Sequence, residues 1–328
     1  MALFRKSKSQ TDGAPAVRVY YASDIHGSES LWRKFLNAAR VYESGVIIMG
    51  GDVTGKAVIP LTQRPDGYEM ELFGRQELLS DEQQLEDAEQ RIRANGMYPH
   101  RMTPEEVARV SALSEDEREL WFAEVMLETF DKWMELAEER LAGTDVRCFL
   151  MPGNDDPPGV DSSIERATRV EACDDRIVEF DGYTMISLGY SNRTPFDSPR
   201  ELEEDELFSR VDRLASQVPD HSRSIFNLHV PPYDSTLDTA AELEEDLTVV
   251  MVGSEPKLIP VGSTAVRELI ERYQPMLSLH GHVHESAAAT HIGRTLSINP
   301  GSDYHTGRIA GCLLALRGDN VRHQFVTG

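Results

Sequence analysis

The chain has 328 residues, of which 40% are hydrophobic and 27% are charged, which is typical of a folded protein with one large domain or two ordinary ones. No apolar run approaches the roughly 18 residues that a membrane-spanning helix needs, which argues against an integral membrane protein. The formal net charge of −23 argues against long nucleic acids and anionic membranes as partners, because both are bound by neutralising phosphates with Lys and Arg. A small phosphorylated substrate stays compatible with this charge if cations shield the site locally.

The cysteines and the N-terminal segment indicate the compartment. Residues 1–16 are polar and have no apolar stretch, so no secretory signal is indicated and a cytoplasmic location is expected. Cys148, Cys173 and Cys312 lack the spacing of a disulfide framework or a thiolate metal site. We interpret each as a small buried hydrophobe rather than a reactive thiol.

A strand, a helix and a second strand are predicted in turn near the start of the chain. The apolar run 16–22 predicts a buried strand that ends in Ser23-Asp24-Ile25-His26-Gly27. Helical spacing follows over 30–41, and the run 45–49 predicts a strand that ends in Gly50-Gly51-Asp52-Val53. This alternation is typical of an α/β protein with a partly parallel sheet, in which sites are built just past the strand ends.

Residues 63–143 interrupt the alternation, and we interpret them as an acidic helical insertion within a single domain of residues 1–328. Two capping boxes, at 103–106 and 114–117, predict helix starts. The second helix is expected to reach about residue 141 and to carry an apolar face at steps of three and four residues. That face is expected to pack on the core domain, with a dimer interface or a lid over the site as alternatives. Its residues are Phe122, Met126, Phe130, Trp133 and Ala137.

The rest of the chain alternates again and then ends in hairpins. Residues 147–151 resume the sheet and end in Pro152-Gly153-Asn154-Asp155-Asp156. The segment 233–262 has no periodic pattern and is expected to be a long loop of the kind that is often functional or mobile. Strands are expected at 176–180, 184–190, 224–228 and 275–279, helices at 199–218 and 262–273, and antiparallel hairpins from 288–292, 295–298, 308–316 and 321–326.

A histidine pair near the C-terminal end is the first candidate for metal binding. His282 and His284 follow a predicted strand and are separated by one residue, so in extended backbone both imidazoles point the same way. Taken alone, two surface histidines on a loop are an equally good interpretation. Further nitrogen and oxygen donors follow other predicted strands, and these are Asp24, His26, Asp52, Asn154 and His229.

These residues occur in the order of a known set of motifs. The blocks are Asp24-x-His26, Gly51-Asp52, Gly153-Asn154, His229 and Gly281-His282-x-His284, and they span nearly the whole chain outside the insertion. In this pattern the sequence resembles the calcineurin-like metallophosphoesterase superfamily, and most of all its predicted-phosphoesterase branch related to cyclic-nucleotide phosphodiesterases. The segment 299–302, Asn-Pro-Gly-Ser, is similar to a feature of smaller bacterial and archaeal phosphodiesterases of that family.

The resemblance implies a fold and a metal centre. The fold would be a four-layer α/β/β/α sandwich of two mixed sheets, with two divalent transition-metal ions between them. Asp52 would bridge the ions, because a carboxylate has two oxygens, and a bridging hydroxide would attack phosphorus. Donors without thiolate suit Mn, Fe, Zn, Co or Ni, and Mn is favoured here. By analogy Asp24, His26, Asp52 and His284 would hold one ion, and Asp52, Asn154, His229 and His282 the other.

The chain departs from the family at Asp155, where many members have a histidine that is thought to assist the leaving group. An aspartate beside two cations is expected to be ionised and therefore a poor proton donor at neutral pH. We expect Asp155 to orient a ligand histidine instead. His280 and Tyr233 are alternative acids, although His280 is equally compatible with a structural role and Tyr233 with that of an ordinary loop residue.

The expected function is that of a metal-dependent phosphoric ester hydrolase, and a phosphodiesterase rather than a monoesterase. Without a clear acid, the enzyme would favour good leaving groups, as in aryl or nucleoside phosphodiesters and anhydrides. The alternative is a catalytically silent metal-binding scaffold that acts through protein interaction over the acidic insertion. A protein phosphatase would need basic residues guiding a groove, which the acidic composition does not suggest. The expected partner is a small phosphorylated substrate, and a second copy of the chain bound through the insertion is the alternative to packing of the insertion on the core domain.

Overall fold

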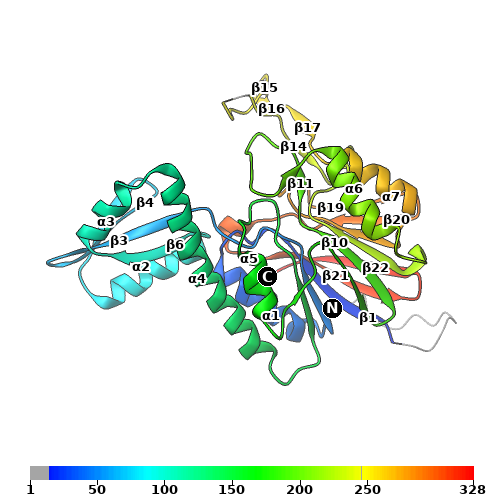
Figure 1. Cartoon of the computed structure of the whole chain (residues 1–328), viewed down its shortest axis with the longest axis horizontal. Coiled ribbons are helices and arrows are strands. Elements are labelled where there is room, and N and C mark those ends of the chain that lie inside the picture. Colours follow the sequence, from blue (N-terminus) through cyan, green and yellow to red (C-terminus); the bar gives the residue numbers. More distant parts are fainter. Residues whose placement is uncertain (1–14, 245) are drawn as a thin grey trace.

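Two six-stranded sheets form the centre of the computed structural model, which describes residues 15–244 and 246–328 (Figure 1). In the first sheet four strands are parallel, and the last two strands of the chain extend it in antiparallel fashion at one edge. The order is β22 (Asn320–Thr327), β21 (Ala310–Arg317), β1 (Val17–Ala22), β2 (Val46–Met49), β7 (Arg147–Leu150) and β8 (Glu171–Ala172).

The second sheet has a parallel centre and an antiparallel strand at each edge. Its order is β19 (Ala288–Ile292), β20 (Thr295–Asn299), β18 (Leu277–Leu279), β13 (Ser224–Leu228), β10 (Tyr183–Leu188) and β9 (Arg176–Phe180). The strands predicted from apolar runs are confirmed in both sheets, with ends that shift by one or two residues.

Alternate residues of the strands point into different hydrophobic layers. Tyr20 and Ile47 pack in one cluster beneath helices, whereas their neighbours Tyr21 and Ile48 pack between the two sheets. This period of two follows from strand geometry and confirms the expected four-layer α/β/β/α sandwich. The helices on the first sheet are α1 (Glu29–Val41), α4 (Glu115–Leu141) and α5 (Val160–Arg166), and those on the second are α6 (Glu204–Ala215) and α7 (Thr264–Tyr273).

Two segments differ from the sequence-based expectation. The helix expected from residue 199 begins only at Glu204, because the buried segment β12 (Glu201–Leu202) pairs instead with β11 (Ser191–Asn192). The long loop at 233–262 contains two short antiparallel ladders. Their strands are β14 (Thr239–Ala241), β15 (Met251–Val252), β16 (Glu255–Pro256) and β17 (Leu258–Pro260), which are too short to show a periodic pattern in the sequence.

The insertion projects from the sandwich and contains a sheet as well as helices (Figure 1). The insertion was expected to be helical, and its helices confirm this in part. The sheet was not expected, and its strands carry charged residues on exposed positions. Helix α2 covers the sheet with Leu85 and Ile92, which pack on Leu61 and Met70. The sheet order is β5 (Arg75–Leu79), β4 (Gly67–Leu72), β3 (Val58–Arg64) and β6 (Tyr98–Met102), and the further helices are α2 (Glu82–Ala94) and α3 (Pro104–Ser111).

Helix α4 leads from the insertion back to the sandwich. Both predicted capping boxes are present, at Thr103 before α3 and at Ser114 before α4. The indole of Trp133 stacks on Trp32 of α1 at 5.9 Å between ring centroids, and Trp32 Nε1 donates to the Trp133 carbonyl at 3.0 Å. The expectation that the apolar face of this helix packs on the core domain is therefore confirmed. Among the described residues, no helix is both long enough and apolar enough to cross a bilayer.

We predict that Trp133→Ala lowers the free energy of unfolding by about 3–5 kcal/mol, because it removes a buried aromatic side chain and leaves a cavity. Denaturant unfolding measures this change. Leu120→Ala is the matched control on the same helix, since Leu120 is 67% exposed and should change stability by less than about 0.5 kcal/mol. Equal effects of the two substitutions would show that α4 is not packed as described.

Candidate metal centre

The loops that follow five strands meet between the two sheets. Asp24 and His26 follow β1 and lie beside the loop after β2, since the Asp24 N–H donates to Gly51 O at 2.9 Å and the His26 N–H to Asp52 O at 3.0 Å. The second sheet contributes histidines from the loops after β13 and β18. All seven predicted metal ligands lie in these loops, and they are Asp24, His26, Asp52, Asn154, His229, His282 and His284.

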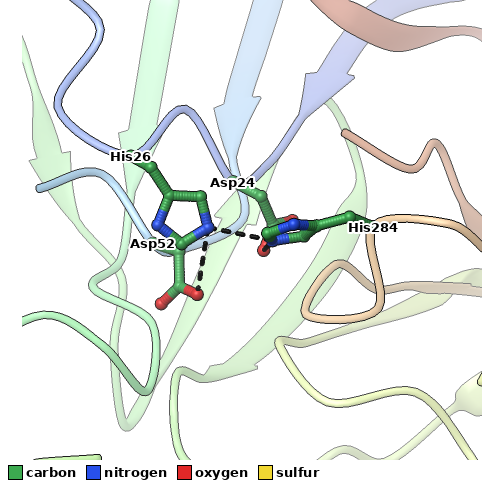
Figure 2. Close-up of side chains that lie close together, drawn as sticks. All are labelled: Asp24, His26, Asp52 and His284. Carbon is green, nitrogen blue, oxygen red and sulfur yellow. Dashed lines mark hydrogen bonds and ion pairs between the residues drawn. The ribbon is translucent and has the colours of Figure 1, made fainter. Parts of the chain in front are cut away.

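Four of these side chains form a first group, shown in Figure 2. His26 Nε2 lies 2.9 Å from His284 Nε2 and 3.7 Å from Asp52 Oδ2. Asp24 Oδ1 lies 3.5 Å from His284 Nε2. One ligand atom from each of the four residues lies within 4.8 Å of the others, which is the spacing expected of atoms that share one ion at about 2.0–2.2 Å.

A second group shares Asp52 with the first. Asp52 Oδ2 lies 3.4 Å from His229 Nε2. The Asn154 Oδ1 atom lies 3.0 Å from His229 Nε2 and 2.7 Å from His282 Nδ1. The two groups therefore divide the ligands as the resemblance implies, with Asp52 between them.

The polar atoms at the centre fit a cation. His229 Nδ1 donates to the Gly50 carbonyl at 2.8 Å. Burial lowers the pKa of His229, but the carboxylates of Asp52 and Asp24 outweigh it and raise the pKa to about 10, so without a metal Nε2 is protonated and faces the oxygens of Asp52 and Asn154 as a donor. A metal ion at Nε2 would take the place of this proton. Asp24 Oδ2 is buried and has no hydrogen-bond partner among the described residues. Divalent cations would satisfy all of these atoms at once, so the residues fit a dinuclear centre.

Burial sets the charge state of two of the imidazoles, whereas at His229 and His284 the neighbouring carboxylates outweigh burial and raise the pKa. It lowers the pKa of His26 to about 3 and that of His282 to about 3, so both rings are neutral and have a lone pair free for a metal. Burial also raises the pKa of Asp52 to about 6, because it disfavours the carboxylate more strongly than the His229 imidazole favours it. A bound cation would reverse this shift, because it stabilises the ionised form.

The backbone is strained at four of the ligands. The φ angles are positive at Asp24 (58°), His26 (40°), Asp52 (50°) and His282 (65°). Such conformations cost on the order of 1–3 kcal/mol each for residues with a side chain, and Asp and His tolerate them better than most. Strain concentrated on the residues that converge here indicates that the loops are shaped for the site rather than for stability.

A comparison with a solved structure supports the fold. No family model matches the chain. An uncharacterized protein of Methanocaldococcus jannaschii is 28% identical over 176 residues, which are 52% of this chain and 72% of that protein. One crystal structure aligns with a TM-score of 0.55 and 15% identity, over 94% of this chain and 98% of its own. An archaeal phosphodiesterase aligns over 94% and 99%, with a TM-score of 0.36 and 11% identity.

The assignment of the fold rests on the two facing sheets and on the order along the chain of the predicted ligands that meet between them. The chain has the calcineurin-like metallophosphoesterase fold. Its buried Asp and His cluster fits a metal-dependent phosphoesterase.

Asp156 holds two ligand loops of the candidate metal centre together, and the sequence interpretation missed it. Its buried carboxylate accepts backbone N–H groups from Val53 at 3.0 Å, Thr54 at 2.8 Å and Gly153 at 2.7 Å, and the Thr54 hydroxyl at 2.6 Å. The loop with Asp52 is thereby fixed to the loop with Asn154. Its position next to Asp155 in the same short loop was the only signal in the sequence.

Asp155 does not lie at hydrogen-bond distance from a ligand histidine, contrary to expectation. Its Oδ2 is 3.9 Å from His26 Nδ1 and instead forms an ion pair with Lys56. Its Oδ1 accepts the Ser198 hydroxyl at 2.6 Å. Burial raises the pKa of Asp155, but the Lys56 ammonium and the hydrogen bonds outweigh this and hold the pKa below its ordinary value, so the carboxylate is ionised.

His280 is a structural residue. It is fully buried, its Nδ1 donates to the carbonyls of Leu228 and Val230 at 2.8 and 3.0 Å, and its Nε2 lies 2.9 Å from the Ser278 hydroxyl. Both ring nitrogens are thus engaged in hydrogen bonds, which agrees with the structural interpretation of His280 and not with its alternative role as an acid. Tyr233 is 40% exposed, and its role stays a prediction.

The insertion touches the metal loops directly. The Tyr98 hydroxyl accepts the Gly55 N–H at 2.6 Å, three residues after Asp52. A side chain at Gly55 would clash with the Gly96 carbonyl, so the backbones approach as closely as glycine permits. On the other side, the ring of Tyr304 lies 4.7 Å from that of His26.

We predict that Asp156→Ala weakens binding of Mn²⁺ about 10- to 100-fold, because backbone N–H groups of both ligand loops lose their acceptor. Calorimetric titration of the metal-free protein with Mn²⁺ measures this change. Asp319→Ala in the exposed turn between β21 and β22 should leave the affinity unchanged. Parent-like affinity of Asp156→Ala would contradict the role given to this carboxylate.

Proposed function

We propose that the protein is a dinuclear-metal-dependent phosphoesterase that hydrolyses a small phosphodiester or nucleotide-type substrate, with Mn as the favoured metal. The observation that carries the proposal is the position of Asp52, whose carboxylate belongs to both groups of convergent ligands. The same arrangement would have little use in a packed core, because it buries two carboxylates among four imidazoles and leaves Asp24 Oδ2 without a hydrogen-bond partner among the described residues.

The residues of the chain would bind and orient the reactants. Two divalent cations, when bound, polarise phosphoryl oxygens and lower the pKa of water. The Gly50 carbonyl fixes the tautomer of His229, and Asp156 fixes the loops of Asp52 and Asn154. Because these contacts preorganise the site, its ligand loops need not rearrange when charge develops on the phosphoryl group.

The charges of the site favour a diester over a monoester. Two divalent ions would bring four positive charges, of which the Asp24 and Asp52 carboxylates cancel two. The Lys56 ammonium is already paired with Asp155 and adds no net charge. A diester brings one negative charge and a monoester brings two, so the monoester would leave less of the excess positive charge for the transition state.

Of the candidate acids among the described residues, Asp155 and His280 are both unsuited to donate a proton, which would favour good leaving groups. Asp155 is ionised, and His280 is fully engaged in hydrogen bonds away from the cluster. A leaving group of low pKa departs without being protonated, so aryl and nucleoside diesters and anhydrides would react faster than alkyl monoesters.

We predict that the Mn²⁺-loaded protein hydrolyses bis(p-nitrophenyl) phosphate, and that Asp52→Asn lowers kcat/KM by at least about 10²-fold, since the shared carboxylate is lost. Release of p-nitrophenolate measures the rate. His291→Ala, in an exposed position of β19, should retain the parent rate. Full metal occupancy without turnover of any phosphodiester would favour a catalytically silent scaffold, and unchanged activity of Asp52→Asn would contradict the assignment of the site.

We also predict a steep dependence of the rate on the leaving group. A series of aryl methyl phosphates with phenols of graded pKa should show kcat/KM falling as the phenol pKa rises, because neither Asp155 nor His280 would protonate the departing oxygen. A flat dependence, with product release shown not to limit the rate, would indicate that an acid is present.

A further inference from the structure

A lysine lies at the rim of the candidate metal centre. Lys56 is in the loop after β2, four residues beyond Asp52, and its ammonium forms an ion pair with Asp155 Oδ2. The side chain of Lys56 is 62% exposed, whereas that of Asp155 is only 15% exposed. The carboxylate thus holds a cation between the buried cluster and solvent.

The position of this cation is fixed from both sides. On the backbone side, Val53 and Thr54 donate to Asp156, and Gly55 donates to Tyr98. On the side-chain side, three further donors fix Asp155. They are the Ser198 hydroxyl at 2.6 Å, the Asn154 amide at 3.1 Å, and its own N–H, which donates to Asp52 Oδ1 at 3.0 Å.

Two predicted metal ligands therefore contact the residue that holds the ammonium. An exposed ammonium has three N–H donors, and an ion pair with one carboxylate oxygen leaves donors for another anion. The pair with Asp155 carries no net charge, so Lys56 would act on a phosphorylated ligand through these directed donors.

We propose that Lys56 binds a phosphate oxygen of the substrate, with Asp155 as the positioning residue that holds the ammonium beside the metals. The inference rests on the proposed function, because it needs a phosphorylated ligand at the metal centre. It assigns Asp155 a role in substrate binding through Lys56, in place of a role as a proton donor.

The test measures metal content, phosphate binding and steady-state kinetics for the Mn²⁺-loaded parent and its variants. Lys56→Gln should keep the metal content, weaken the binding of inorganic phosphate about 10- to 100-fold in calorimetry, and raise KM for a phosphodiester more than it lowers kcat. Lys56→Arg should recover most of the affinity, because it keeps the charge. Asp155→Asn should weaken phosphate binding less than Lys56→Gln does. Lys132→Gln on the exposed surface of α4 is the control for loss of one charge.

The outcomes separate this inference from the proposed function. Parent-like phosphate binding and KM in Lys56→Gln, with metal content unchanged, would overturn the role of Lys56 alone. A parent protein that binds no metal, or that binds metal but neither phosphate nor a phosphodiester, would overturn the proposed function and the role of Lys56 with it. If Lys132→Gln weakened phosphate binding as much as Lys56→Gln does, the effect would come from the net charge of the protein, and the specific role of Lys56 would be overturned.

Discussion

Two buried carboxylates surrounded by imidazoles are the constraint on which the rest of the structure depends. Asp24 and Asp52 come from the first sheet, and the imidazoles that face them come from both sheets. Asp24 Oδ1 also accepts the backbone N–H of His282 at 2.9 Å, so one carboxylate joins the two sheets directly. Placing such charges away from water is unfavourable unless a cation or a full set of hydrogen-bond donors compensates for the lost hydration. The four-layer architecture brings together at one point the loops that carry the compensating groups.

A second layer of contacts maintains that point. Asp156 joins the ligand loops within the first sheet, and Tyr98 joins them to the insertion. The same loop carries Lys56 outward to the rim, where Asp155 holds it. The insertion is therefore coupled to the site through its β-sheet, while its long helix α4 is coupled to the core through Trp133 and Trp32. A change in how the insertion docks would alter the hydrogen bond between Tyr98 and Gly55, which lies three residues after Asp52.

The ligands could be predicted from the sequence because strand ends can be recognised from apolar runs, and residues at the carboxyl ends of parallel strands converge whatever their separation in the chain. His26 and His284 are 258 residues apart and yet lie 2.9 Å apart at Nε2. The sheet of the insertion was missed because its strands are half-buried and mix apolar with charged residues, as in Tyr68-Glu69-Met70-Glu71-Leu72, instead of forming the apolar runs on which the other strands were recognised. The role of Asp155 was also missed, because its partner Lys56 lies in another loop and no local pattern links the two.

The division of labour between the two ligand groups is the central claim, and anomalous diffraction from crystals of the Mn²⁺-loaded protein tests it most directly. Two peaks at the manganese edge are predicted on either side of the Asp52 carboxylate, one beside His26 and His284 and the other beside His229 and His282. A single peak, or peaks that avoid the Asp52 carboxylate, would contradict the account.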